Sequence, residues 1–250
     1  MISKKLSSLI RSLHQKKYRK KENLFLVEGV KSVLELIQSG YSIKTLVATP
    51  MFLQEHLSFL KSADFEIAEA GAAEITALGT LQTNDAALAV VHMQEEQLLK
   101  AEAGEWALLL DDVGDPGNLG TIIRIADWYG IRKLICSETT VDFYNPKVIA
   151  ASKGSFTRVS AHYTNLLHFL EGENKPVYGA DLQGASVHTF AFPEAGYLLM
   201  GSESHGISQE LGSKLAGRIT IPAWGGAESL NVAIATAILC DNLRRSSSSQ

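Results

Sequence analysis

The sequence predicts an α/β protein made of two domains. Short apolar runs with β propensity alternate with segments of helical periodicity through most of the 250 residues. A polar, charged stretch over residues 96–105 interrupts this alternation and lacks a β pattern. We therefore expect a first domain over residues 1–95, a linker over 96–105 and a second domain over 106–245.

The first domain is expected to be a small α/β unit that follows a basic N-terminal segment. Its short apolar runs read as strands, and the amphipathic stretches between them read as helices. The expected strands cover residues 24–29, 43–49, 65–70 and 87–93, and the expected helices cover 30–40, a segment from about residue 50, and 72–79.

The second domain repeats the alternation with more deeply buried strands. Near-continuous apolar strands are typical of a parallel sheet that is covered on both faces. In such open sheets, ligands bind in the loops beyond the carboxyl ends of the strands. The expected elements cover residues 106–113, 118–130, 133–136, 145–152, 159–164, 165–172, 176–182, 197–202 and 218–223, followed by a final helix.

Composition excludes several classes of protein. No apolar stretch reaches the roughly 18 residues that a membrane span requires, and the first residues do not form a signal peptide. Cys136 and Cys240 stand far apart in apolar surroundings, which favours reduced, buried thiols. From the lack of a membrane span and a signal peptide we expect a cytoplasmic protein with no membrane partner. No cysteine and histidine cluster is present, so we expect no metal.

Basic charge is concentrated at the N-terminus. Residues 1–21 contribute +8 and no acidic side chain to a chain of formal net charge −4, which leaves −12 for the remainder. Apolar residues recur at helical spacing between the cations, so we expect an amphipathic segment with one packed and one positive face. Three interpretations are open: a solvated charged face, a contact with a polyanion, or a membrane-surface helix. The membrane is the weakest, because the first 17 residues lack aromatic anchors.

Three turns of the second half combine glycine with polar residues: "GDPGNLGTIIR", "GSESHGIS" and "PAWGGAESLN". Each allows close approach of backbone to a ligand and presents N–H groups at the start of a helix. None has the G-x-G-x-x-G spacing of a dinucleotide site or the lysine of a phosphate loop. The absence of that fingerprint weighs against a nicotinamide-dependent oxidoreductase, the main rival among enzymes.

Polar side chains in these turns have structural as well as functional interpretations. Asn118 can cap the helix that follows it. Arg124 interrupts an apolar helical run, which indicates either an anionic ligand or an ion pair with Asp127 or Glu203. Glu203 in turn fits a stabilising carboxylate at a helix start.

The third turn offers two candidates. Ser229 can serve as the N-cap of the final helix. Asn231 would then lie inside the first turn, where asparagine is unfavourable, so we expect its side chain to have another role.

Taken in order, the three turns resemble the motifs of the SpoU (TrmH-type) RNA ribose 2′-O-methyltransferases of the SPOUT superfamily, over residues 106–243. The stretch "KYRKKENLFLVEGVKSVLE" is similar to the substrate-binding domain fused ahead of this module, a small α/β fold like that of certain RNA-binding ribosomal proteins. The resemblance implies a deep trefoil knot in the C-terminal domain, S-adenosyl-L-methionine as cofactor, RNA as substrate and a homodimer.

Site residues follow from the same resemblance. It assigns catalytic positions to Asn118, Arg124, Glu203, Ser229 and Asn231, and cofactor contacts to Gly201, Ile221 and Leu230. A guanidinium with a pKa above about 12 is a poor base, so we expect Arg124 to orient the ribose and stabilise developing negative charge.

The resemblance also favours RNA as the polyanion. We expect the phosphate backbone to contact Lys16, Lys17, Arg19, Lys20 and Lys21. Ribosomal RNA is the expected substrate, with transfer RNA as the alternative within the family. A non-catalytic RNA-binding protein is the rival from another class, but it would leave Arg124, Glu203 and Asn231 without a role.

Overall fold

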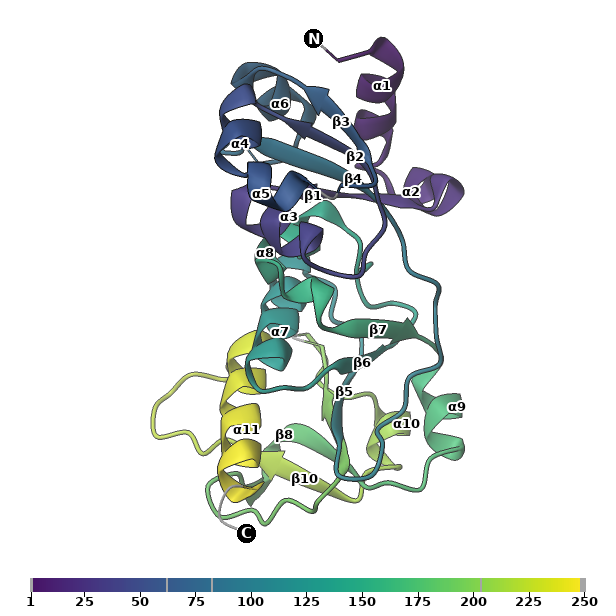
Figure 1. Cartoon of the computed structure of the whole chain (residues 1–250). Helices are drawn as coiled ribbons and strands as arrows, with labels where there is room; N and C mark the ends of the chain where they lie inside the picture. The colour runs from purple at the N-terminus through teal and green to yellow at the C-terminus, as the bar shows by residue number, and fades with distance from the viewer. Residues whose placement is uncertain (1, 62, 82, 203, 248–250) are drawn as a thin grey trace. The chain divides into compact units, whose positions relative to one another are not determined.

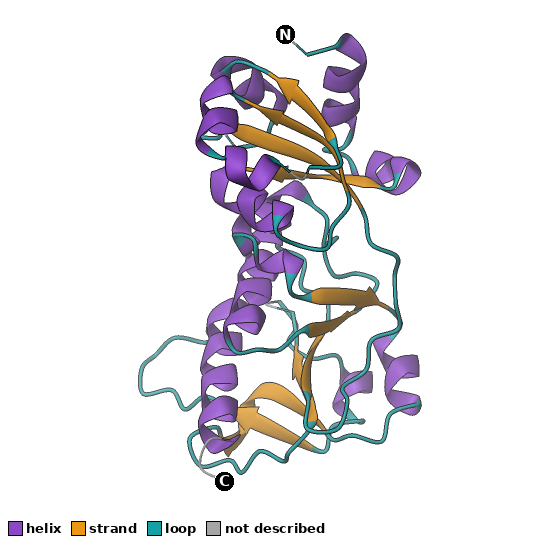
Figure 2. Cartoon of the chain, viewed as in Figure 1, coloured by secondary structure: helices purple, strands orange, loops and turns teal. Residues whose placement is uncertain are grey.

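A computed structural model describes residues 2–61, 63–81, 83–202 and 204–247 of the chain (Figure 1). It contains two compact units: Met1–Glu95 with Asp142–Thr157, and Glu96–Val141 with Arg158–Gln250. Helices and strands alternate within both units (Figure 2), which confirms the predicted α/β class. The segment 142–157 differs from expectation, because it folds with the first unit although the sequence placed it in the second domain.

The first unit is built on a four-stranded mixed sheet. Its strand order is β1-β4-β2-β3, in which β4 runs antiparallel to β1 and β2, and β3 runs parallel to β2. The strands are β1 (Leu24–Glu28), β2 (Ile43–Ala48), β3 (Glu66–Glu69) and β4 (Ala87–His92). Around them lie α1 (Lys4–Ser12), α2 (Lys16–Glu22), α3 (Val30–Ile37), α4 (Pro50–Glu55), α5 (Leu57–Leu60), α6 (Ala72–Leu78), α8 (Pro146–Ser152) and a 3₁₀ turn, η1 (Ser155–Thr157).

Both faces of β1 are covered, so all five of its residues are buried. Leu24 and Leu26 face the apolar cluster that α1 and α6 complete. Alternate residues of a strand point to opposite faces, and Phe25 packs on Tyr41, Tyr144 and Phe156 with ring centroids 4.5–6.0 Å apart. The segment 142–157 thus supplies the second cover of β1, and this apolar burial explains why it belongs to the first unit.

A buried ion pair ties the same segment to the basic N-terminus. Arg19 is only 2% exposed and donates to Asp142 Oδ2 from Nε at 3.1 Å and from Nη2 at 2.5 Å. Its Nη1 donates to the carbonyls of Leu13 and His14, both at 3.0 Å. Since the guanidinium is fully engaged, Arg19 holds α2 in place, and its expected role as a phosphate contact is wrong.

The second unit contains a six-stranded sheet in which every pair of neighbours is parallel, as the apolar strands predicted. The order is β10-β8-β9-β5-β6-β7. The strands are β5 (Trp106–Leu110), β6 (Lys133–Cys136), β7 (Ser160–Tyr163), β8 (Val177–Ser186), β9 (Gly196–Met200) and β10 (Gly217–Thr220). The central strands β5 and β9 are buried along their whole length.

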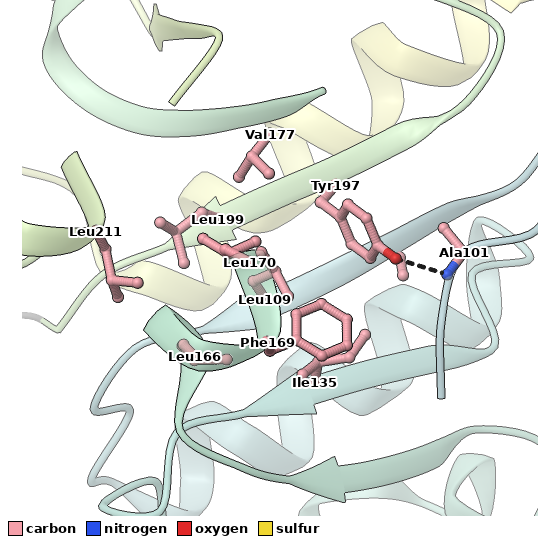
Figure 3. Close-up of a cluster of buried hydrophobic side chains, with 11 residues drawn as sticks. Ala101, Leu109, Ile135, Leu166, Phe169, Leu170, Val177, Tyr197, Leu199 and Leu211 are labelled. Atoms are coloured by element: carbon pink, nitrogen blue, oxygen red, sulfur yellow. Dashed lines mark hydrogen bonds between the residues drawn. The ribbon is translucent and has the colours of Figure 1, made fainter. Parts of the chain in front are cut away.

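Helices cover both faces of this sheet. On one face, α9 (Leu166–Glu171) and α10 (Gln209–Gly212) close the apolar cluster of Figure 3 over Leu109, Ile135 and Leu199. Tyr197 reaches from the same cluster to Ala101, whose N–H donates to the tyrosine oxygen at 3.0 Å. The stretch expected as a linker is therefore held against the second unit through Ala101.

The other face carries two helices that lie side by side, α7 (Pro116–Trp128) and α11 (Val232–Ser247) (Figure 1). Their carboxyl-terminal ends are joined by Arg244 Nε, which donates to the Tyr129 carbonyl at 2.6 Å, and by the Tyr129 hydroxyl with Asp241. Among the described helices of both units, none has the length and apolar character needed to cross a membrane.

Candidate functional site

The three glycine-rich turns follow parallel strands of the second unit. The second begins directly after β9, the third one residue after β10, and the first three residues after β5, so all three lie beyond the carboxyl edge of one sheet. β5 and β9 are neighbours, and the backbone N–H of Asp111 donates to the Met200 carbonyl at 2.9 Å. The first two turns are thus adjacent at the edge where open α/β sheets bind ligands.

The first turn is capped differently from expectation. Asp115 is the N-cap of α7 and accepts from the Asn118 N–H at 2.8 Å, with Pro116 at the first helical position. The interpretation of Asn118 as the cap is therefore wrong. An aspartate directly before a proline is a sequence signal for this arrangement, and it identifies Asp115. Capping by Asp115 leaves the Asn118 side chain to contact another turn.

Arg124 lies on α7, and its side chain is exposed. The alternative ion pair with Asp127 is not formed, because the carboxylate of Asp127 accepts from Arg158 at 2.8–3.0 Å. Among the residues that the structure describes, none forms a hydrogen bond or ion pair with the Arg124 guanidinium. Its other expected partner, Glu203, lies outside the described residues.

The third turn contains the clearest link between the predicted site residues. The side-chain Nδ2 of Asn231 donates to Asn118 Oδ1 at 2.9 Å, across 113 positions of sequence. Asn231 Oδ1 accepts from the backbone N–H groups of Ala233 at 3.0 Å and Ile234 at 3.3 Å. Asn231 is therefore the N-cap of α11, and the assignment of that cap to Ser229 is wrong. Ser229 is exposed two residues earlier.

The second turn forms a closed hairpin. Ser202 and Gly206 pair through two backbone hydrogen bonds of 3.0 and 2.9 Å, and Ser202 Oγ accepts from the His205 N–H at 3.1 Å. A Cβ atom at Gly201 would overlap the backbone of Gly206, and Gly206 itself has φ +65°. The close approach of the Gly206 backbone thus requires glycine at position 201, and the positive φ favours glycine at position 206.

Two of the expected cofactor positions offer apolar surface. Ile221 is half-buried after β10, and Leu230 is 47% exposed immediately before Asn231. These two side chains suit the neutral, partly apolar adenosine part of a ligand better than a phosphate. This chemistry fits S-adenosyl-L-methionine.

The two cysteines of the second unit are not activated as nucleophiles. Burial raises the pKa of the Cys240 thiol to about 12 and moves that of Cys136 upward as well, so both thiols stay protonated at neutral pH. Both cysteines are buried and unpaired, as expected. Within the described ranges, no group of three or more metal-ligating side chains is found.

The expected RNA contacts lie on α2 of the first unit. Lys16, Lys17, Lys20 and Lys21 are exposed. Lys17 Nζ lies 4.7 Å from the ring centroid of Tyr18, and Lys21 Nζ lies 3.9 Å from Glu22. Both contacts are at the surface and weak, so these cations remain accessible to a polyanion.

The two roles of Asn231 can be separated by substitution. Asn231→Ala removes the cap of α11 and should lower the free energy of unfolding by about 1 kcal/mol. Asn231→Ser keeps a capping oxygen and should therefore retain most of the wild-type stability. Urea unfolding followed by tryptophan fluorescence measures the effect, because Trp106, Trp128 and Trp224 all lie in the second unit. Ser229→Ala is the matched control and should change stability by less than about 0.5 kcal/mol. A loss at Ser229 equal to that at Asn231 would contradict the assigned cap.

Comparisons with known proteins agree with this geometry. Residues 105–241 match the SpoU rRNA Methylase family, and residues 8–89 match the MRM3-like substrate binding domain. The chain is 34% identical over 244 residues to the Bacillus subtilis protein named 23S rRNA (guanosine(2553)-2′-O)-methyltransferase RlmP, covering 94% of each chain. A Thermus thermophilus tRNA (guanosine(18)-2′-O)-methyltransferase is 27% identical over 154 residues, which cover 60% of this chain and 79% of that protein.

Solved structures show the same fold. The SpoU methyltransferase AviRb from Streptomyces viridochromogenes, solved in complex with AdoMet, superposes with a TM-score of 0.87 at 25% identity, covering 99% of each chain. The resemblance of the three turns is therefore confirmed, and the chain belongs to the SpoU rRNA methylase family of the SPOUT superfamily.

Proposed function

We propose that this protein transfers the methyl group of S-adenosyl-L-methionine to a ribose 2′-hydroxyl of ribosomal RNA. The observation that carries the proposal is the hydrogen bond between Asn118 and Asn231, which joins the first and third turns of a SpoU family member on the helix that also bears Arg124. When bound, S-adenosyl-L-methionine supplies an electrophilic methyl group on a sulfonium sulfur.

In the proposed mechanism, Arg124 acts on the RNA. Its exposed guanidinium donates to the ribose oxygen and the adjacent phosphate, and stabilises negative charge as the 2′-hydroxyl loses its proton to water. Asn118 and Asn231 hold the start of α7 against the start of α11. Ser229 positions the ribose, and Glu203 orients Arg124. Gly201, Ile221 and Leu230 bind the cofactor in a fold that we propose to contain a deep trefoil knot.

Ribosomal RNA is favoured over transfer RNA by the extent of the matches. The alignment with the RlmP relative covers 94% of this chain and so extends over its substrate-binding domain. The alignment with the transfer RNA enzyme covers only 60% of this chain. A non-catalytic RNA-binding role is disfavoured, because the asparagine pair and the accessible arginine are intact. The two unpaired, buried cysteines suit a reducing compartment, so we place the enzyme in the cytoplasm.

Methyl transfer is tested with tritiated S-adenosyl-L-methionine and separate pools of unmodified ribosomal and transfer RNA. We expect label at one alkali-resistant linkage of ribosomal RNA. Arg124→Lys should lower turnover by about 10²- to 10³-fold with unchanged cofactor affinity, because lysine lacks the planar fork of donors. The exposed Arg132→Lys serves as the control. Label in transfer RNA would overturn the substrate, and near-normal turnover of Arg124→Lys would overturn the role of Arg124.

RNA attraction is proposed to reside on α2. Changing Lys16, Lys17, Lys20 and Lys21 to Gln should weaken RNA binding and lower the slope of log K against log salt by up to about 3, with cofactor affinity unchanged. These substitutions leave Arg19 and its buried ion pair intact. Lys44→Gln with Lys61→Gln, two exposed lysines elsewhere on the unit, should leave the slope unaltered. An unchanged slope in the α2 variant would rule out this surface.

A homodimer is part of the proposal. The pair α7 and α11 exposes Trp128 at 83% near its carboxyl end and Ile234 at 52% near its amino end, so apolar side chains are accessible at both ends of the pair. We assign the cover of these side chains to a second copy of the chain, because most soluble oligomers are symmetric homo-oligomers.

Sedimentation equilibrium tests the dimer. Trp128→Glu combined with Ile234→Glu should convert a dimer to a folded monomer, because two charges would be buried in the contact. Leu182 on β8 is 72% exposed, which lies between the exposures of Trp128 and Ile234, so Leu182→Glu is the control and should leave the mass unchanged. A monomeric wild-type protein would show that no dimer forms through these helices.

A further inference from the structure

The second turn is held at both of its ends by Asp111, the residue that directly follows β5. Met200, the last residue of β9, accepts from the backbone N–H of Asp111 at 2.9 Å. Ser208, the residue before α10, donates its backbone N–H to Asp111 Oδ2 at 3.1 Å. The seven residues between these two anchors include Gly201 and the Ser202–Gly206 hairpin.

The two anchors depend on Asp111 in different ways. The bond to Met200 uses backbone atoms and tolerates any side chain except proline. The bond to Ser208 needs an acceptor oxygen at the γ position of residue 111, so the identity of this side chain decides whether the far end of the turn is fixed.

We propose that Asp111 is a positioning residue for S-adenosyl-L-methionine. Its carboxylate fixes the carboxyl end of the hairpin, and thereby holds the backbone of Gly201 in the conformation that receives the cofactor. The proposal rests on the proposed role of Gly201 in cofactor binding. Asp111 acts through the turn and does not itself touch the ligand.

The rest of the turn explains why removal of this carboxylate leaves the fold intact. Ile207, next to Ser208, packs against the apolar cluster of Figure 3. Ile207 and the cluster both belong to the second unit, so this packing is independent of the first unit. We therefore expect Asp111→Ala to loosen the turn locally while the sheet keeps its core.

The neighbouring aspartate provides a matched control. Asp112 is exposed, has φ +58° and bonds to Ser137 Oγ through its backbone N–H at 2.9 Å. Asp112→Asn removes the same charge one position away, and asparagine tolerates positive φ. Asp111→Asn also removes a charge but keeps an acceptor oxygen, so it separates the hydrogen bond from the net charge.

Ser208 allows the same bond to be removed from its other side. Its φ of −58° and ψ of 148° suit proline, and its side chain makes no capping hydrogen bond to α10. Ser208→Pro therefore deletes the donor N–H with little other change. If the bond carries the effect, the Asp111→Ala and Ser208→Pro variants and their combination form a non-additive cycle.

Titration calorimetry with S-adenosyl-L-methionine measures the dissociation constants. We expect Asp111→Ala and Ser208→Pro each to raise the constant about tenfold, with no further rise in the double variant, while Asp111→Asn and Asp112→Asn stay within about twofold of wild type. Wild-type affinity in Asp111→Ala, or additive effects in the double variant, would overturn the proposal while leaving the cofactor assignment intact.

Two further outcomes are decisive. If Asp111→Ala does not fold, as judged by circular dichroism, Ser208→Pro decides the test alone, and wild-type affinity in that variant overturns the proposal. If the wild-type protein binds no S-adenosyl-L-methionine, the cofactor assignment fails, and the role of Asp111 fails with it.

Discussion

The parallel pairing of β5 with β9 is the constraint on which the site depends. Both strands are buried along their whole length, so their register is fixed by packing on two faces. Because they run in the same direction, their carboxyl ends meet, and the turns that follow them must share one edge of the sheet. The register of this strand pair places Asp111 beside Met200, and this brings the first two turns together.

The third turn reaches this edge by a different route. It follows β10 at the far side of the sheet, and it is returned to the first turn by α11, which packs along α7. The bonds at Asn118 and Asn231 close one end of this helix pair, and those of Tyr129 and Arg244 close the other. The site is thus assembled from side chains that bond to one another, and the cationic Arg124 is left facing solvent, as suits a residue that meets an anionic substrate.

Local patterns in the sequence were sufficient for the α/β class, the parallel sheet and the three turns, because strand burial and glycine requirements act over a few residues. The caps were misassigned by three positions at Asn118 and two at Ser229, since several residues near each helix start can cap it and only the backbone decides. The basic pattern around Arg19 predicts a surface cation, because the partner that buries it, Asp142, lies 123 positions away. The bridge between Asn118 and Asn231 is equally nonlocal, although both residues were identified through the family resemblance.

The placement of 142–157 bears on how this protein could have evolved. The chain passes between the two units three times, after residues 95, 141 and 157. The first unit therefore takes one cover of β1 and the partner of Arg19 from a stretch that the SpoU family match includes. Such an arrangement disfavours exchange of the substrate-binding domain alone. A domain joined at residues 96–105 would lack the rings of Tyr144 and Phe156 that pack on Phe25. Its buried Arg19 would also lack the carboxylate of Asp142. The two units are thus expected to be inherited together.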